Sequence, residues 1–104
     1  MKSISDYIGG WFIGNFEPTL HKTESFEVAV KHYYCGQVEK PHYHKVAIEF
    51  TVIIGGTAKI NDIIYKDGDI VKIMPGEISV FEAITDLKTL VIKTPSVKND
   101  KYIV

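Results

Sequence analysis

The chain has 104 residues, twelve lysines, no arginine and a formal net charge of −1 at pH 7. This near-neutral balance provides no basic field for a phosphate backbone, so we expect no nucleic-acid partner. No apolar run approaches the roughly 20 residues of a transmembrane helix, so we expect no membrane partner either. The length and the 45% apolar content predict one globular domain.

Residues 1–25 predict an N-terminal extension or strand ahead of a domain that spans residues 26–104. Helical spacing of apolar residues covers only one or two turns near the start, and it ends at Gly9–Gly10. The aromatic run at 11–16 then predicts a short strand. Residues 17–25 predict a loop, because they contain a proline and several hydroxyl residues.

Cysteine usage and the start of the chain bear on the cellular compartment. A single cysteine, Cys35, excludes an internal disulfide and is typical of a reducing environment. The first ten residues lack the apolar run of a signal peptide. We therefore expect a cytoplasmic protein, in which Cys35 is a small buried residue rather than a reactive thiol.

From residue 26 onward, strand-like segments and turns alternate every eight to twelve residues. The first segment alternates in a way that predicts one face made of Phe26, Val28, Val30, His32 and Tyr34. Further strands are expected near residues 42–44, 49–54, 58–61, 63–65, 70–74, 78–84 and 88–94. About eight short strands with this spacing predict an all-β protein, an antiparallel sandwich or barrel.

Several of these strands are apolar on both faces, most clearly at residues 51–54 and 90–92. One face can fill the interior of a barrel, and the other face then needs a second buried surface. Together with the apolar aromatic run at 11–16, this pattern predicts a symmetric homodimer.

The segment PHYHKVAIEF at 41–50 gathers the strongest candidates for metal ligands or proton carriers. Residues two apart on a strand point to the same side, so His42 and His44 enter one space. Glu49 joins them only if the chain turns within 45–48 and starts a new strand. Two imidazoles and one carboxylate suit iron(II), and they also suit zinc with an open coordination position.

A wider pattern, G-x5-H-x-H-x4-E-x6-G, is formed by Gly36, His42, His44, Glu49 and Gly56. This pattern resembles the first motif of the cupin superfamily. The resemblance covers roughly residues 26–94 and implies a small single-domain cupin. The implied fold is a double-stranded β-helix, or jelly-roll, barrel. The implied ligands of a divalent transition metal (iron, zinc, manganese or nickel) are the two histidines and the glutamate.

Residues 68–76 resemble the second cupin motif mainly through their two glycines. By position, Ser79 stands where that motif supplies a further histidine ligand, and a neutral hydroxyl is a poor substitute. If the strand after residue 76 alternates, Ser79 and Phe81 share a face. His32, on a neighbouring strand, is the best candidate for a replacement ligand.

Three functions are consistent with these residues. The first is a metal-binding cupin whose open coordination positions hold a small-molecule ligand, with or without turnover. The second is a metal-free sugar isomerase or epimerase, in which the candidate catalytic residues His42 and His44 act as acid and base. The third is a non-catalytic binding or structural module with a degenerate site.

Overall fold

A computed structural model describes residues 3–104, which form strands and two short helical turns. The helical turns are the 3-10 helices η1 (Ile4–Asp6) and η2 (Ile8–Gly10). The strands are β1 (Trp11–Ile13), β2 (Glu27–Tyr33), β3 (His42–Tyr43), β4 (Ile48–Ile54), β5 (Thr57–Ile60), β6 (Ile63–Lys66), β7 (Ile70–Ile73), β8 (Phe81–Ala83), β9 (Leu87–Thr94) and β10 (Tyr102–Ile103). The all-β prediction is confirmed. No helix among the described residues is long and apolar enough to cross a membrane.

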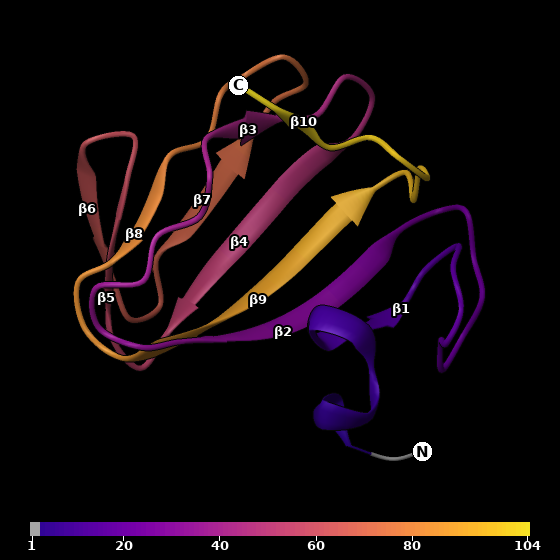
Figure 1. Cartoon of the computed structure of the whole chain (residues 1–104), viewed down its shortest axis with the longest axis horizontal. Coiled ribbons are helices and arrows are strands. Elements are labelled where there is room, and N and C mark those ends of the chain that lie inside the picture. Colours follow the sequence, from indigo (N-terminus) through magenta and orange to yellow (C-terminus); the bar gives the residue numbers. More distant parts are fainter. Residues whose placement is uncertain (1–2) are drawn as a thin grey trace.

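The strands form two layers (Figure 1). One layer is a five-stranded sheet in the order β1-β2-β9-β4-β7, with antiparallel neighbours. The other contains the sheet β6-β5-β8 and the pair β10-β3. Backbone hydrogen bonds of 2.8 and 3.2 Å between His42 and Ser79 join β3 to the segment before β8. This arrangement is the jelly-roll barrel that the resemblance implied.

The register of the large sheet decides which side chains enter the barrel. In β2, β9 and β4, odd-numbered residues pair with odd-numbered residues of the neighbouring strand. The side chains of these odd-numbered residues form the inner face. At one end, these strands contribute to an apolar core made of Ile53, Ala58, Ile60, Val71, Ile73, Phe81, Ala83 and Leu87. Toward the other end, the same faces carry Glu27, Glu49 and Lys93. The barrel therefore has an apolar end and a polar end.

The prediction that His32 faces inward is wrong. Lys31 and Tyr33 line the interior, whereas His32 is exposed on the outer face of β2. The apolar alternation has another cause, because the N-terminal segment covers part of that outer face. Gly10 packs so closely on the carbonyl group of Val30 that a Cβ atom there would collide with it. Val30 thus points to a partly covered outer surface, and not to the interior.

The prediction that Cys35 is buried is also wrong. Cys35 is exposed in the turn after β2, where its thiol donates a hydrogen bond to the carbonyl of Ile84 at 3.0 Å. Its backbone N–H donates to Asp86 at 2.8 Å. The following residue, Gly36, has a φ of 88°, a left-handed conformation that suits a tight surface turn. The turn geometry therefore places the cysteine at the surface.

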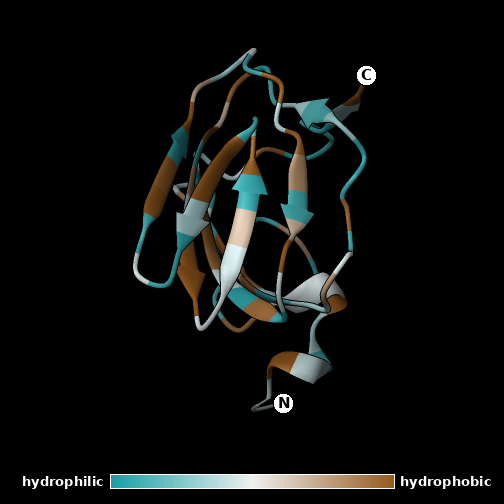
Figure 2. Cartoon of the chain, turned by 90° about the vertical axis from the view of Figure 1, so that its left-hand side faces the viewer, coloured by the Kyte–Doolittle hydropathy of each residue, from teal (hydrophilic) through white to brown (hydrophobic). Residues whose placement is uncertain are grey.

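Large apolar side chains are exposed on the outside of the barrel. Figure 2 turns the strands from the left of Figure 1 toward the viewer and shows apolar stretches along them. Ile63 and Ile64 of β6 are 55% and 50% exposed, and Ile70 of β7 is 64% exposed. The sequence pattern pointed instead to residues 51–54 and 90–92, where Ile54 is 40% exposed and Val52, Leu90 and Ile92 are half-buried.

Candidate metal centre

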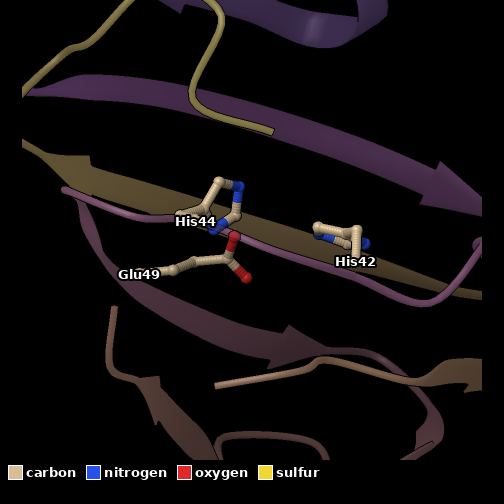
Figure 3. A group of neighbouring side chains, drawn as sticks. All are labelled: His42, His44 and Glu49. Atoms are coloured by element: carbon tan, nitrogen blue, oxygen red, sulfur yellow. The ribbon is translucent and has the colours of Figure 1, made fainter. Parts of the chain in front are cut away.

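His42, His44 and Glu49 converge inside the polar end of the barrel (Figure 3). The chain bends at Lys45 and Val46, and β4 then begins at Ile48, which returns Glu49 to the side of the histidines. One ligand atom from each of the three residues lies within 4.8 Å of the others. Both histidines are buried, with 6% and 3% of their surface exposed. Three potential ligands thus share one interior space.

Two of the three side chains are held by hydrogen bonds from the groups around them. His42 Nδ1 lies 3.0 Å from the carbonyl oxygen of Lys40, so its N–H can donate there and leave the Nε2 lone pair free. The hydroxyl of Thr51 donates to Glu49 Oε2 at 2.9 Å, which leaves Oε1 available. Partners of this kind orient metal ligands and fix their tautomers in metalloproteins.

His44 is held in its neutral form. Burial lowers the pKa of His44 to about 4, and the neighbouring charges of Lys93 and His42 act in the same direction. At neutral pH its imidazole therefore carries a lone pair that can accept a hydrogen bond or bind a metal. The ammonium group of Lys93 lies 3.3 Å from Nε2 and can donate a hydrogen bond to it.

The turn between His44 and Glu49 is fixed by Asp100 from the C-terminal tail. The Asp100 carboxylate accepts hydrogen bonds from the backbone N–H groups of Lys45, Val46 and Ala47 at 2.9, 3.2 and 2.9 Å. Burial alone would raise the pKa of Asp100, but these N–H groups outweigh burial and hold it below its usual value. The carboxylate therefore stays charged and anchors the turn.

The three ligands open on a cavity of about 80 Å³. Its apolar wall is formed by Ile60, Ile73, Phe81 and Val91. Three lysines, Lys31, Lys93 and Lys101, line the same cavity. The ammonium groups of Lys31 and Lys93 also lie 5.4 and 4.8 Å from the centre of the Trp11 ring, within the range of a cation–π contact.

Comparison with known proteins identifies the fold. No family model and no curated protein matches the sequence. An uncharacterised protein with a double-stranded β-helix domain from Klebsiella pneumoniae is similar to the whole chain and matches over 90% of its own length, with 20% identity and a TM-score of 0.74. A cupin from Bacteroides fragilis is also similar, with 23% identity and a TM-score of 0.63. The similarity covers 77% of this chain and 74% of the Bacteroides protein. The chain has the cupin fold.

A third similar structure is one part of a larger cupin-fold protein. Oxalate decarboxylase from Bacillus subtilis is similar to 78% of this chain over 24% of its own length, with 19% identity and a TM-score of 0.68. At this level of identity, the likeness extends to the fold alone.

Within this cupin fold, the residue at the second-motif position faces the histidines. Ser79 is 6% exposed and lines the cavity. It lies next to His42, with which it forms an antiparallel backbone bridge. Ser79 and Phe81 share the inner face, as the alternation predicted. His32 lies outside the cavity, so among residues 3–104 the cavity wall contains two imidazoles, those of His42 and His44. His32 therefore supplies no replacement ligand.

The donor groups fit a divalent transition metal. Ligand atoms at about 2.0–2.2 Å from a tetrahedral ion lie roughly 3.4 Å apart. Within the observed span of 4.8 Å, the most distant ligand atoms must therefore approach each other by about 1.4 Å, a distance that side-chain rotation can supply. The hydrogen bonds of His42 and Glu49 leave one ring nitrogen and one carboxylate oxygen available, and the lowered pKa of His44 keeps its imidazole neutral.

Sequence reasoning missed the lysines and the acidic anchor of the site. A lysine that points into a barrel is unusual and would normally attract notice. Lys31 and Lys93 did not, because the sequence does not show which face of their strands is the inner one. Asp100 carries no local signal, because its partners lie 53 to 55 residues earlier in the chain. Only the folded chain brings it to the turn.

Proposed function

We propose that this cupin-fold protein binds a divalent transition metal through His42, His44 and Glu49. The observation that carries the proposal is the convergence of three ligand atoms within 4.8 Å, two of them on buried histidines. Iron, zinc, manganese and nickel all accept imidazole and carboxylate ligands. When bound, the metal supplies a Lewis acid with open positions for a small-molecule ligand.

The cavity limits the size of that ligand. Its volume of about 80 Å³ is well below the roughly 300–1,000 Å³ of pockets that enclose drug-sized molecules. A ligand of a few non-hydrogen atoms fits, whereas a nucleotide sugar does not. The similar structure of oxalate decarboxylase is named for an acid of that small size.

A metal-free site is the second candidate function. The Lys93 ammonium already lies 3.3 Å from His44 Nε2, so a cation of the protein itself partly fills the place of a metal. In that case His42 and His44 would act as an acid–base pair, as in a sugar isomerase or epimerase. The volume of the cavity counts against a whole sugar as its substrate.

Elemental analysis of the untagged protein separates these candidates. We expect about one transition-metal ion per chain, and metal-stripped protein should bind Zn²⁺ again. His44→Ala should weaken that binding at least about tenfold, because a ligand is lost. His21→Ala is the matched control, since His21 is exposed in a loop away from the cavity. Parent protein that binds none of the four metals, or equal effects of the two substitutions, would exclude the metal site.

We also propose that the protein is a homodimer. The exposed isoleucines of β6 and β7 are large apolar side chains whose burial by a partner copy would be favourable. Light scattering should give twice the mass of the chain, and Ile64→Lys should shift the protein toward the monomer. A monomeric parent protein at micromolar concentration would contradict the proposal.

A further inference from the structure

Lys93 occupies the centre of the polar end of the barrel. On β9 it pairs with Glu27 of β2 on one side and with Glu49 of β4 on the other, so the three residues form a row across the sheet. Its ammonium lies 3.3 Å from His44 Nε2 and 3.9 Å from Glu27 Oε2. The Lys93 side chain is only 14% exposed. A buried cation therefore touches one of the proposed metal ligands.

A metal and the Lys93 ammonium compete for the same atom. The single lone pair of His44 Nε2 can accept a hydrogen bond or bind a metal, but not both. Glu27 offers the ammonium a second partner on the neighbouring strand, with a side chain that is 11% exposed. Glu27 and Lys93 both line an adjoining hollow of about 650 Å³ outside the metal site. The ammonium can thus move toward Glu27 when His44 binds a metal.

The cavity retains an excess of positive charge once a metal is bound. Three lysines and two carboxylates, those of Glu39 and Glu49, line it. Glu39 is already engaged by the Tyr33 hydroxyl at 2.7 Å, and Glu27 compensates Lys93 from outside the cavity. A divalent ion therefore adds two positive charges to a nearly balanced site. An anionic ligand is the complement of such a site.

The other walls favour a short carboxylate over a larger anion. The cavity of about 80 Å³ accepts only a few non-hydrogen atoms, and its apolar side can contact a short carbon chain. Thr89 lines the same cavity at 1% exposure, and its hydroxyl interacts with the side chain of Tyr33. Because a hydroxyl group rotates, Thr89 can turn from Tyr33 to donate to a ligand oxygen.

We propose that the ligand of the metal site is a short-chain carboxylate and that Lys93 is its specificity-determining cation. The inference rests on the proposed metal binding. Lys93 then has two opposite effects. It weakens metal binding by holding His44 Nε2, and it strengthens carboxylate binding by offering a charge-assisted hydrogen bond beside the metal.

Lys93→Met tests both effects at once, because methionine keeps much of the length without the charge. Metal-stripped variant should bind Zn²⁺ about tenfold more tightly than the parent protein. The Zn²⁺-loaded variant should bind acetate about tenfold more weakly than the Zn²⁺-loaded parent. Acetamide, which has the size of acetate without its charge, should bind both proteins equally and weakly. Lys88→Met is the matched control, since Lys88 is exposed on the other face of β9.

The outcomes distinguish this inference from the metal proposal itself. A parent protein that binds no Zn²⁺ overturns metal binding first. If the parent binds Zn²⁺, the role of Lys93 is tested by the Zn²⁺ and acetate affinities of the two variants. Equal affinities in Lys93→Met and Lys88→Met overturn that role. Equal binding of acetate and acetamide by the loaded parent overturns the carboxylate. If Lys93→Met does not fold, Lys93→Gln is measured instead, and the same outcomes apply.

Discussion

The two ends of the barrel interior are built on the same strands and have opposite chemistry. On β4, Ile53 is fully buried in the apolar core, whereas Glu49 lies four residues away in the polar end. On β9, Leu87 packs in the core, whereas Lys93 faces His44. Each strand alternates identically along its length, so the backbone alone does not distinguish the ends. The side chains make one end a core and the other a site.

The ends also differ in how their burial is stabilised. Side chains of the apolar end need no hydrogen bonds, and their removal from water is favourable in itself. Buried polar and charged groups of the polar end are stable only with partners. Thr51 donates to Glu49, the Lys40 carbonyl contacts the His42 ring, and backbone N–H groups donate to Asp100. Substitutions at the apolar end should therefore change stability, while those at the polar end should change protonation and ligand affinity. Four experiments test this division.

The largest effect is expected at the apolar end. Ile53→Ala should lower the free energy of unfolding by about 4 kcal/mol, because it leaves a cavity in a fully buried cluster. Ile54→Ala, at the next residue on the opposite face and 40% exposed, should cost less than about 1 kcal/mol. Urea unfolding measures both values. Equal losses at the two positions would show that the apolar end is not the main source of stability.

The next effect is a pH dependence from the polar end. The unfolded chain protonates His44 near pH 6.5, while the native protein resists protonation until pH about 4. The unfolded state therefore binds more protons between these values, and metal-free protein loses stability as the pH falls through this window. At 1.36 kcal/mol per pKa unit, the loss is roughly 3 kcal/mol. His44→Gln should flatten the slope, and an unchanged slope would contradict the neutral state of His44.

Completion of the ligand set gives the third effect. Ser79 pairs with His42 and faces the cavity, so Ser79→His brings a third imidazole to the site. Zn²⁺ affinity of metal-stripped protein should rise at least about tenfold, which corresponds to 1.4 kcal/mol. The gain should shrink below pH ~6, because the imidazole must lose its proton to bind. Ser79→Ala should leave the affinity unchanged, and an equal affinity of the His and Ala variants would place residue 79 out of reach of the metal.

The smallest effect is a gain in stability at Thr89, which pairs with Ile53 and also lines the cavity. Thr89→Val replaces a buried hydroxyl that interacts with Tyr33 but makes no well-formed hydrogen bond within residues 3–104, so metal-free protein should become about 1 kcal/mol more stable. Thr94→Val is the control on the same strand, since the Thr94 hydroxyl donates to the carbonyl of Ser25 at 2.8 Å. That substitution should lower the stability. Thermal unfolding of both variants measures the difference, and a loss of stability in Thr89→Val would mean that its hydroxyl has a partner.

The sequence by itself determined most of the strands and the grouping of three ligands, although it did not predict β10 (Tyr102–Ile103). The histidines lie two residues apart, and a bend before β4 brings Glu49 to them. These relations span only eight residues, so local geometry is sufficient to specify them. The position of Ser79 on the inner face followed from simple alternation in the same way.

Only the tertiary structure decided which face of β2 is the interior and which distant residues complete the site. Alternation with a period of two separates the two faces of a strand, but it does not tell which face is the interior. In β2 the N-terminal segment covers part of the outer face, and the inner face carries charged groups. Lys31 therefore lies inside, and His32 lies outside. Lys93 meets His44, and Asp100 meets the turn after it, across about 50 residues. Such contacts depend on how the strands pair and close the barrel, which no short segment encodes.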